Sequence, residues 1–229
     1  MLPRTPEPEL MDDADQAQAY AAEDFSAPNE LFVSLFLDRF PDWRPRGWLV
    51  DLGCGPADIP LRLKRHHPAL RLVGVDGAPA MLAHGRELWA QAGLQADALW
   101  VTATLPDLAL PVAPGDAVIS NSLLHHLHDP SVLWRSLRAV GAPGAPVLVM
   151  DLMRPADAAE VQELVQAHAA DAPAVLRRDF EASLHAAFTA EEVRGQLAAA
   201  GLDDFRVERV SDRHLAAWGR LPDAQAAGP

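Results

Sequence analysis

Glycines and acidic residues near the start of the chain have the types and spacing that bind a nucleoside. Gly53 and Gly55 form a turn after the apolar run that ends at Leu52, and Asp76 ends the next apolar run. Glycines in such a turn let backbone N–H groups approach a ligand, because no Cβ stands in the way. An acidic residue at the tip of the second strand can hold ribose hydroxyls. Strand, glycine turn, helix, strand and acid in this order predict a nucleoside-binding half-fold.

The residue at position 58 discriminates between two ligands that fit this outline, a dinucleotide and S-adenosylmethionine. The dinucleotide fingerprint G-x-G-x-x-G requires Gly or Ala at its last position, which here is Asp58. A carboxylate at that place repels pyrophosphate, whereas the sulfonium and ammonium of S-adenosylmethionine tolerate or favour it. Asp51, before the turn, suits the same cation. We therefore favour S-adenosylmethionine, and a nicotinamide-dependent oxidoreductase is the least favoured interpretation.

Three motifs in sequence order resemble those of the class I S-adenosylmethionine-dependent methyltransferases. They are Val50–Pro56, Val73–Asp76 and Asp116–Asn121, and the similarity extends over residues 45–220. Within that class the chain is most similar to the broad small-molecule group that includes quinone-biosynthesis enzymes (methyltransferase type 11/12-like). The resemblance implies a transferase that moves a methyl group from S-adenosyl-L-methionine to a small-molecule acceptor.

The resemblance also implies which residues hold the cofactor. The Gly53–Gly55 turn would hold the methionine portion and Asp51 its ammonium, directly or through water. Asp76 would bind the ribose hydroxyls, and Met81 would cover the adenine. The carboxylate that many members place after the third strand is missing, so Thr102 or a backbone group must contact the adenine amino group. The complete predicted cofactor set is Tyr20, Asp51, Gly53, Cys54, Gly55, Asp76, Gly77, Met81, Thr102, Ala103 and Asn121.

Two members of this set have alternative interpretations. Cys54 is expected to be a small packing residue rather than a nucleophile, since nothing nearby marks it as a thiolate. Tyr20 either reaches over the cofactor as part of a lid or lies on an exposed helix face.

Histidines follow the fourth predicted strand, at the sheet edge where substrates lie in open α/β folds. His125 or His126 can act as general base, because a neutral imidazole takes up a proton near pH 7. The alternative is a structural role, with a ring bonded to the backbone. We predict no metal site, since adjacent side chains on one short segment rarely converge on one ion. Ser122 after Asn121 breaks the Asn-Pro-Pro-aromatic motif, which disfavours DNA or protein glutamine as substrate.

The acceptor side is predicted from position in the fold. Residues 177–188 fall between the fifth strand and the last helix, an insertion that commonly covers the acceptor pocket in this fold. Phe180, His185 and Arg154 are the candidates for lining that pocket. The alternative is that the apolar positions of the segment form the buried face of a short helix.

The alternation of apolar runs and helical patterns predicts an α/β fold. The expected architecture is a Rossmann-like, doubly wound, mostly parallel seven-stranded sheet with an antiparallel C-terminal strand pair and an N-terminal helical cap. We divide the chain into a flexible tail (1–10), the cap (11–44), the S-adenosylmethionine-binding domain (45–220) and a second tail (221–229). The expected strands are 48–52, 71–75, 98–102, 116–120, 146–151, 205–210 and 214–218, and the helices that precede them in the cap are 12–22 and 30–40.

Composition agrees with one globular enzyme. The chain has 229 residues, of which 49% are hydrophobic and 22% charged. Its net charge of −13 opposes binding to nucleic acid. No signal peptide or membrane-length apolar run is visible, and the single cysteine fits a reducing cytosol, so a cytoplasmic protein without a membrane partner is expected. For the oligomeric state, a homodimer is one of the alternatives. The alternative function is a catalytically inactive, methyltransferase-like nucleoside-binding protein with a regulatory or assembly role.

Overall fold

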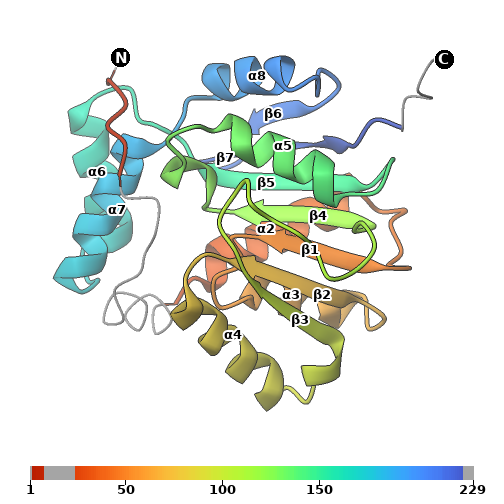
Figure 1. Ribbon diagram of the computed structural model, residues 1–229. Helices are drawn as coiled ribbons and strands as arrows, with labels where there is room; N and C mark the ends of the chain where they lie inside the picture. The colour runs from red at the N-terminus through yellow and green to blue at the C-terminus, as the bar shows by residue number, and fades with distance from the viewer. Residues whose placement is uncertain (1, 8–23, 224–229) are drawn as a thin grey trace.

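The structure, a computed structural model, describes residues 2–7 and 24–223. Its centre is one sheet in the order β3-β2-β1-β4-β5-β7-β6, in which β7 runs antiparallel to both its neighbours and all other pairs are parallel (Figure 1). This confirms the predicted Rossmann-like sheet with an antiparallel C-terminal pair. The strands are β1 (Trp48–Leu52), β2 (Arg71–Asp76), β3 (Ala98–Thr102), β4 (Ala117–Asn121), β5 (Pro146–Leu152), β6 (Arg206–Arg209) and β7 (His214–Arg220).

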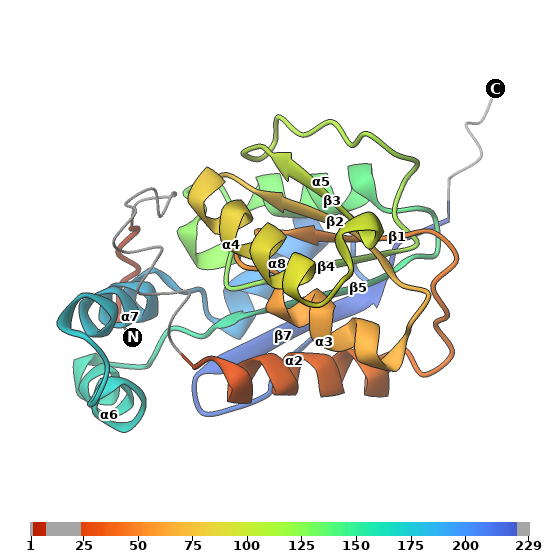
Figure 2. The same ribbon diagram turned by 90° about the horizontal axis from the view of Figure 1, so that it is seen from below.

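Helices cover both faces of the sheet. Figure 2 shows α2 and α3 below the sheet and α5 above it. A separate pair, α6 and α7, lies beyond the carboxyl end of β5 (Figure 1). The helices are α2 (Ser26–Arg39), α3 (Asp58–His66), α4 (Pro79–Gln91), α5 (Ser131–Val140), α6 (Ala158–Ala169), α7 (Ala174–Ala186) and α8 (Ala190–Ala199), with two short 3₁₀ turns, η1 (Gln95–Asp97) and η2 (Leu124–His126).

The strands read as continuous apolar runs because both of their faces are buried. Val50 of β1 faces the core that contains Trp134 of α5. Leu49, its neighbour in sequence, faces the opposite core, which contains Phe32 and Phe36 of α2. Successive strand side chains point to opposite faces, so one strand supplies both cores. The sheet is thereby fixed between two helical layers, and its carboxyl edge is left to form the site.

Local sequence signals account for several element ends. Thr189 caps α8, and its side chain forms a capping box with Glu192, a Thr-x-x-Glu pattern typical of helix starts. β4 begins one residue later than predicted, at Ala117, and the carboxylate of the preceding Asp116 accepts the N–H groups of Arg46 and Gly47 at 2.5 and 2.7 Å.

One N-terminal segment differs from its expected place. Residues 2–7, called here the N-terminal arm, lie against the α6–α7 pair and η2 instead of extending into solvent. Helix α2, in the predicted cap, packs beside α3 on one sheet face, where Phe32, Val33 and Phe36 are buried. The predicted helix 12–22 lies outside the described residues. Among the described helices, none has the length and apolar character needed to cross a membrane.

Candidate active site

A cavity of about 510 Å³ opens at the carboxyl ends of β1, β2 and β4. This first cavity lies where strand order reverses in the sheet, between β1 and β4, which is the usual ligand position in open α/β folds. Much of the predicted cofactor set lines it, namely Gly53, Gly55, Asp76, Gly77, Met81, Ala103 and Asn121.

The glycine turn forms one wall of the first cavity. Gly53 and Gly55 have φ values of +71° and +50°, in the left-handed region that favours glycine. The N–H groups of Gly53 and Cys54 donate to Val75 O at 2.8 and 2.9 Å, which fixes the turn against the end of β2. A Cβ on Gly53 would meet Leu123 at 3.0 Å, whereas a Cβ on Gly55 would enter open space. The turn is therefore packed on one side and open to a ligand on the other.

Asp76 links this turn to helix α4. Its Oδ2 accepts the N–H of Gly55 at 2.8 Å, and its Oδ1 accepts the N–H of Ala78 at 2.8 Å. Burial raises the pKa of the Asp76 carboxyl, and the two backbone donors oppose that rise. Each carboxylate oxygen can accept a further hydrogen bond, so Asp76 retains acceptor capacity for ribose hydroxyls. The free acceptor capacity of Asp76 thus fits the ribose of a nucleoside.

Three predicted cofactor residues do not line the first cavity. Asp51 is 3% exposed, and burial, together with the charge of nearby Asp76, raises the pKa of its carboxyl well above the usual range. Burial likewise raises the pKa of the Cys54 thiol, which keeps the sulfur protonated. Thr102 is exposed, and Thr104 lines the cavity instead.

Tyr20, the remaining member of the predicted set, lies outside the described residues. Of the residues proposed to line an acceptor pocket, only Phe180 does so. Arg154 is buried and donates to Ala187 O at 3.0 Å and to Glu192 Oε1 at 2.7 Å, so it ties β5 to the start of α8.

A second cavity, of about 240 Å³, adjoins the first and is bounded by α6, α7 and the start of α2. The two cavities share the residues Asn121, Ser122 and His126. Among the described residues, the buried Oδ1 of Asn121 has no hydrogen-bond partner. A buried acceptor in this state is costly unless a ligand or water supplies a donor. The boundary between the cavities therefore suits contact between two bound molecules.

The two predicted histidines occupy different surroundings. His125 is 3% exposed, and its Nδ1 lies 2.5 Å from Asp151 Oδ1. Burial alone would lower the pKa of His125, but the charge of Asp151 and the hydrogen bond to it raise that pKa. The pKa of Asp151 is correspondingly lowered by His125 against the effect of burial. The Asp151 carboxylate thus favours the protonated form of the buried His125 ring, whereas His126 lines both cavities.

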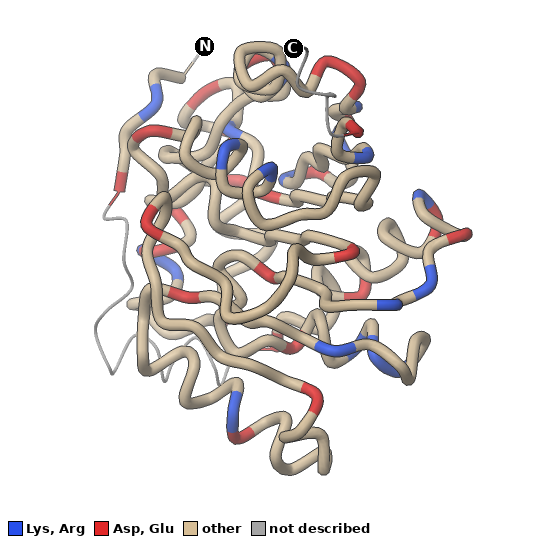
Figure 3. The backbone as a smooth tube through the Cα atoms, turned by 45° about the vertical axis from the view of Figure 1, so that its right-hand side comes forward, with Lys and Arg blue, Asp and Glu red and all other residues tan. Residues whose placement is uncertain are grey.

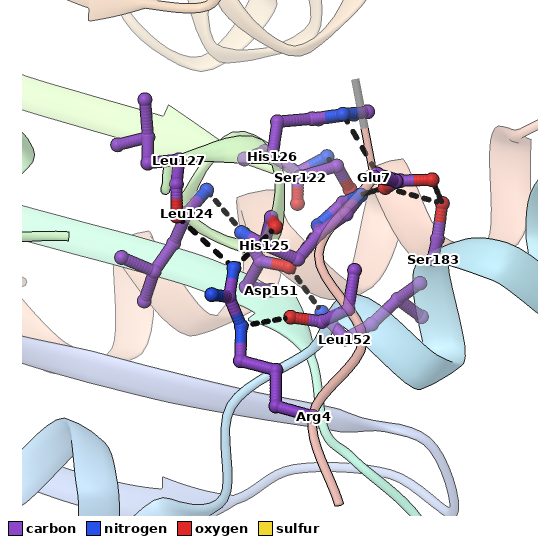
Figure 4. Close-up of polar contacts among 12 residues, drawn as sticks. Arg4, Glu7, Ser122, Leu124, His125, His126, Leu127, Asp151, Leu152 and Ser183 are labelled. Atoms are coloured by element: carbon purple, nitrogen blue, oxygen red, sulfur yellow. Dashed lines mark hydrogen bonds and ion pairs between the residues drawn. The ribbon is translucent and has the colours of Figure 1, made fainter. Parts of the chain in front are cut away.

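The structure adds a residue that sequence reasoning missed, Glu7 of the N-terminal arm. Figure 4 shows Glu7 between Ser183 and the two histidine rings. Its Oε1 lies 3.4 Å from His125 Nε2 and 3.3 Å from His126 Nδ1, and it accepts the Ser183 hydroxyl at 3.0 Å. One ligand-type atom from each of Glu7, His125 and His126 lies within 4.8 Å of the others. Asp151 was also missed, although an acid interrupting the apolar run of β5 is a visible signal.

Known proteins share this domain and fold. Residues 49–144 match the family model of a methyltransferase domain. An uncharacterized methyltransferase of Mycobacterium tuberculosis is 32% identical over 107 residues, which cover 47% of this chain and 51% of that protein. A trans-aconitate 2-methyltransferase of Azoarcus is 31% identical over 147 residues, which cover 62% of this chain and 51% of that protein. The chain spans about half the length of the curated relatives it matches.

Solved structures agree over nearly the whole chain. A SAM dependent methyltransferase from Aquifex aeolicus superposes with a TM-score of 0.66 at 16% identity, covering 91% of this chain and 98% of that one. The plantazolicin methyltransferase BamL, in complex with a triazolic desmethylPZN analog and SAH, gives a TM-score of 0.70 at 14% identity, covering 90% and 91%. At these identities the likeness is one of fold. The chain thus contains a methyltransferase domain at residues 49–144, and its fold is the one seen in S-adenosylmethionine-dependent methyltransferases.

Proposed function

We propose that this protein transfers the methyl group of S-adenosylmethionine to a small-molecule acceptor. The observation that carries the proposal is the shared boundary of the two cavities at Asn121, Ser122 and His126. A nucleoside cofactor in the first cavity and an acceptor in the second would meet at that boundary. Holding two reactants in such contact supplies much of the rate enhancement of a displacement reaction.

The residues of the first cavity have assignable tasks. Asp76 binds the ribose hydroxyls, and the open side of the Gly53–Gly55 turn receives the methionine portion. Asp51 lies in β1 just before the glycine turn and is buried, so it acts on the ammonium of the methionine portion through intervening groups. Bound S-adenosylmethionine supplies an electrophilic methyl group and leaves as S-adenosylhomocysteine.

His126 is the histidine placed to assist a protic acceptor. It borders both cavities, while His125 is committed to its ion pair with Asp151. His126 takes the proton that the acceptor atom loses as the methyl group bonds to it. This step applies to hydroxyl or amine acceptors, since a carboxylate acceptor has no proton to lose at neutral pH.

The charges at the second cavity favour an uncharged or cationic acceptor. Asp24 and Asp179 line it, and its one arginine, Arg213, already contacts Asp212 at 3.0 Å and His168 at 2.9 Å. Acidic positions (red in Figure 3) recur over many elements, in agreement with the net charge of −13. A tricarboxylate such as trans-aconitate, the acceptor that some relatives' names indicate, would meet repulsion here.

The test is calorimetric titration of the purified protein with S-adenosylmethionine and S-adenosylhomocysteine. We expect micromolar binding that is lost in Asp76→Asn and retained in Asp203→Asn, which removes the same charge at an exposed position. Absence of binding by the unaltered protein would refute the proposal.

A screen of acceptors with labelled methyl donor then separates enzyme from binding protein. Label transferred to an alcohol or amine supports the proposed reaction. Cofactor binding without transfer to any acceptor class would support the inactive, regulatory alternative, and efficient transfer to trans-aconitate would contradict the assignment of acceptor charge.

A further inference from the structure

The N-terminal arm is fastened along the rim of the second cavity. The Leu2 N–H donates to Ala156 O at 2.9 Å, and the Thr5 N–H donates to His185 O at 2.9 Å. Leu2 also packs against the apolar cluster between α6 and α7. These contacts come from the segment before α6 and from the last turn of α7, so the position of the arm is set by the fold.

Arg4 attaches the arm to the turn that carries the histidines. Its Nε donates to Ala186 O at 2.6 Å, and its Nη2 donates to the carbonyls of His125 and Leu127, both at 3.0 Å. The guanidinium also stacks over the Phe188 ring, 4.0 Å from its centroid. Arg4 thus joins the arm to the backbone of η2 and to the end of α7, and this attachment delivers Glu7 to the site (Figure 4).

Glu7 and Asp151 face opposite nitrogens of His125. Asp151 meets Nδ1 at 2.5 Å, and Glu7 lies 3.4 Å from Nε2. A doubly protonated ring between two carboxylates offsets one of their charges. The same Glu7 oxygen lies 3.3 Å from Nδ1 of His126, the histidine that borders both cavities. A carboxylate in that place stabilises a proton on Nδ1.

We propose that Glu7 is a positioning residue of the transfer site, which holds the proton of His126 on Nδ1 so that Nε2 receives the acceptor's proton. The inference rests on the proposed function for the destination of that proton. As the methyl group bonds to the acceptor, the acceptor's proton passes to Nε2, and the Glu7 carboxylate stabilises the resulting imidazolium. The arrangement has the logic of an acid–histidine pair, with the acid supplied by the arm.

Two groups next to Glu7 favour its ionised form. Burial is the largest influence and raises the pKa of Glu7, with Asp151 and Asp179 acting in the same direction, while His125 and the Ser183 hydroxyl oppose the rise. For His125, Asp151 and Glu7 favour the charged ring, and Arg4 opposes it.

The test compares Glu7→Gln with Glu163→Gln, the same substitution at an exposed position of α6. Histidine tautomers are read by long-range ¹H–¹⁵N NMR on the full-length chain, with His126→Gln used to assign the signals. In Glu7→Gln we expect the ratio of Nδ1-protonated to Nε2-protonated His126 to fall about fivefold or more, and the pKa of His125 to fall. Once an acceptor has been identified, the kcat of Glu7→Gln should be about 10- to 100-fold lower than that of the unaltered protein, while the KM for S-adenosylmethionine stays unchanged. Glu163→Gln should leave every quantity as it is.

Each outcome decides the inference. Unchanged His126 tautomers in a folded Glu7→Gln protein would overturn it. Stoichiometric binding of Zn²⁺ to the unaltered chain, lost in Glu7→Gln, would also overturn it, because the three side chains would then hold a cation instead of a proton. If Glu7→Gln does not fold, Ser183→Ala removes only the hydroxyl that orients Glu7, and a smaller shift of the tautomer ratio in the same direction is expected. Since these signals need no cofactor, failure to bind S-adenosylmethionine would refute the proposed function separately.

Discussion

The Nδ1 of His125 lies 2.5 Å from Oδ1 of Asp151 in the interior of the protein. The second Asp151 oxygen accepts the N–H of Leu124 at 2.7 Å. One carboxylate at the carboxyl end of β5 therefore fixes both the backbone and a side chain of η2. Because η2 follows β4, the pair ties two neighbouring strand ends together at the place where the two cavities meet.

Replacing Asp151 by asparagine should destabilise the protein by about 3 kcal/mol. The variant keeps the size of the side chain but removes the carboxylate that bonds to Nδ1 of His125, so the buried ring keeps only Glu7 as a counter-charge. Urea unfolding followed by circular dichroism measures the change. Asp203→Asn, at an exposed position, should alter the unfolding free energy by less than about 0.5 kcal/mol, and an equal effect of both variants would contradict the role of the ion pair.

His126→Gln should lower kcat about 100-fold or more while the affinity for S-adenosylmethionine remains. The side chain lines the boundary of the cavities, so its loss removes a proton acceptor rather than a cofactor contact. The measurement is kcat with a hydroxyl or amine acceptor, together with calorimetric cofactor binding. His66→Gln, at the exposed end of α3, is the control. A variant that keeps full kcat across the pH range would rule out His126 as the base.

The sheet followed directly from sequence because its signals are local. Apolar runs bounded by turn residues marked the strands to within two residues at each end, and Thr189 with Glu192 has the capping-box pattern that starts α8. The glycine turn and Asp76 were recognisable for the same reason, since their spacing alone places them at one sheet edge.

The contacts around the histidines were not predictable in this way. Glu7 reaches His126 because the arm that carries it bonds to residues far away in the sequence, as Arg4 does to the carbonyls of His125 and Leu127. Nothing in the local pattern of the first residues marks that docking. Composition rich in proline and acids instead predicted a solvated tail for this segment. Similarly, Thr102 was expected at the first cavity, but the chain after β3 turns so that Thr104 lines it.

His214 should make the protein less stable as the pH falls from about 6.5 to about 4. It is 6% exposed, and burial, followed by the charge of Arg213, lowers its pKa to about 4. In this window the unfolded chain binds a proton that the folded chain does not, so unfolding is favoured as pH decreases, by up to about 3 kcal/mol. Unfolding free energies measured at pH 7.5 and pH 4.5 should differ less in His214→Gln than in the unaltered protein. The same pH dependence in both would show that His214 is not responsible.

Gly55→Ala should weaken cofactor binding more than it weakens the fold. Its φ of +50° strains any residue with a Cβ by about 1 kcal/mol, but the Cβ would meet no atom within 4 Å. The added methyl group would instead extend toward the first cavity, where Gly55 is a lining residue and its N–H is bonded to Asp76. We expect about a tenfold loss of affinity for S-adenosylmethionine, since about 1.4 kcal/mol of lost contact corresponds to that factor.

Gly195→Ala is the matched control. Gly195 lies within α8 with open space around its Cβ position. This substitution should therefore stabilise the helix by about 0.5–1 kcal/mol and leave cofactor binding unchanged. Unimpaired binding by a folded Gly55→Ala protein would place the cofactor elsewhere than at this turn.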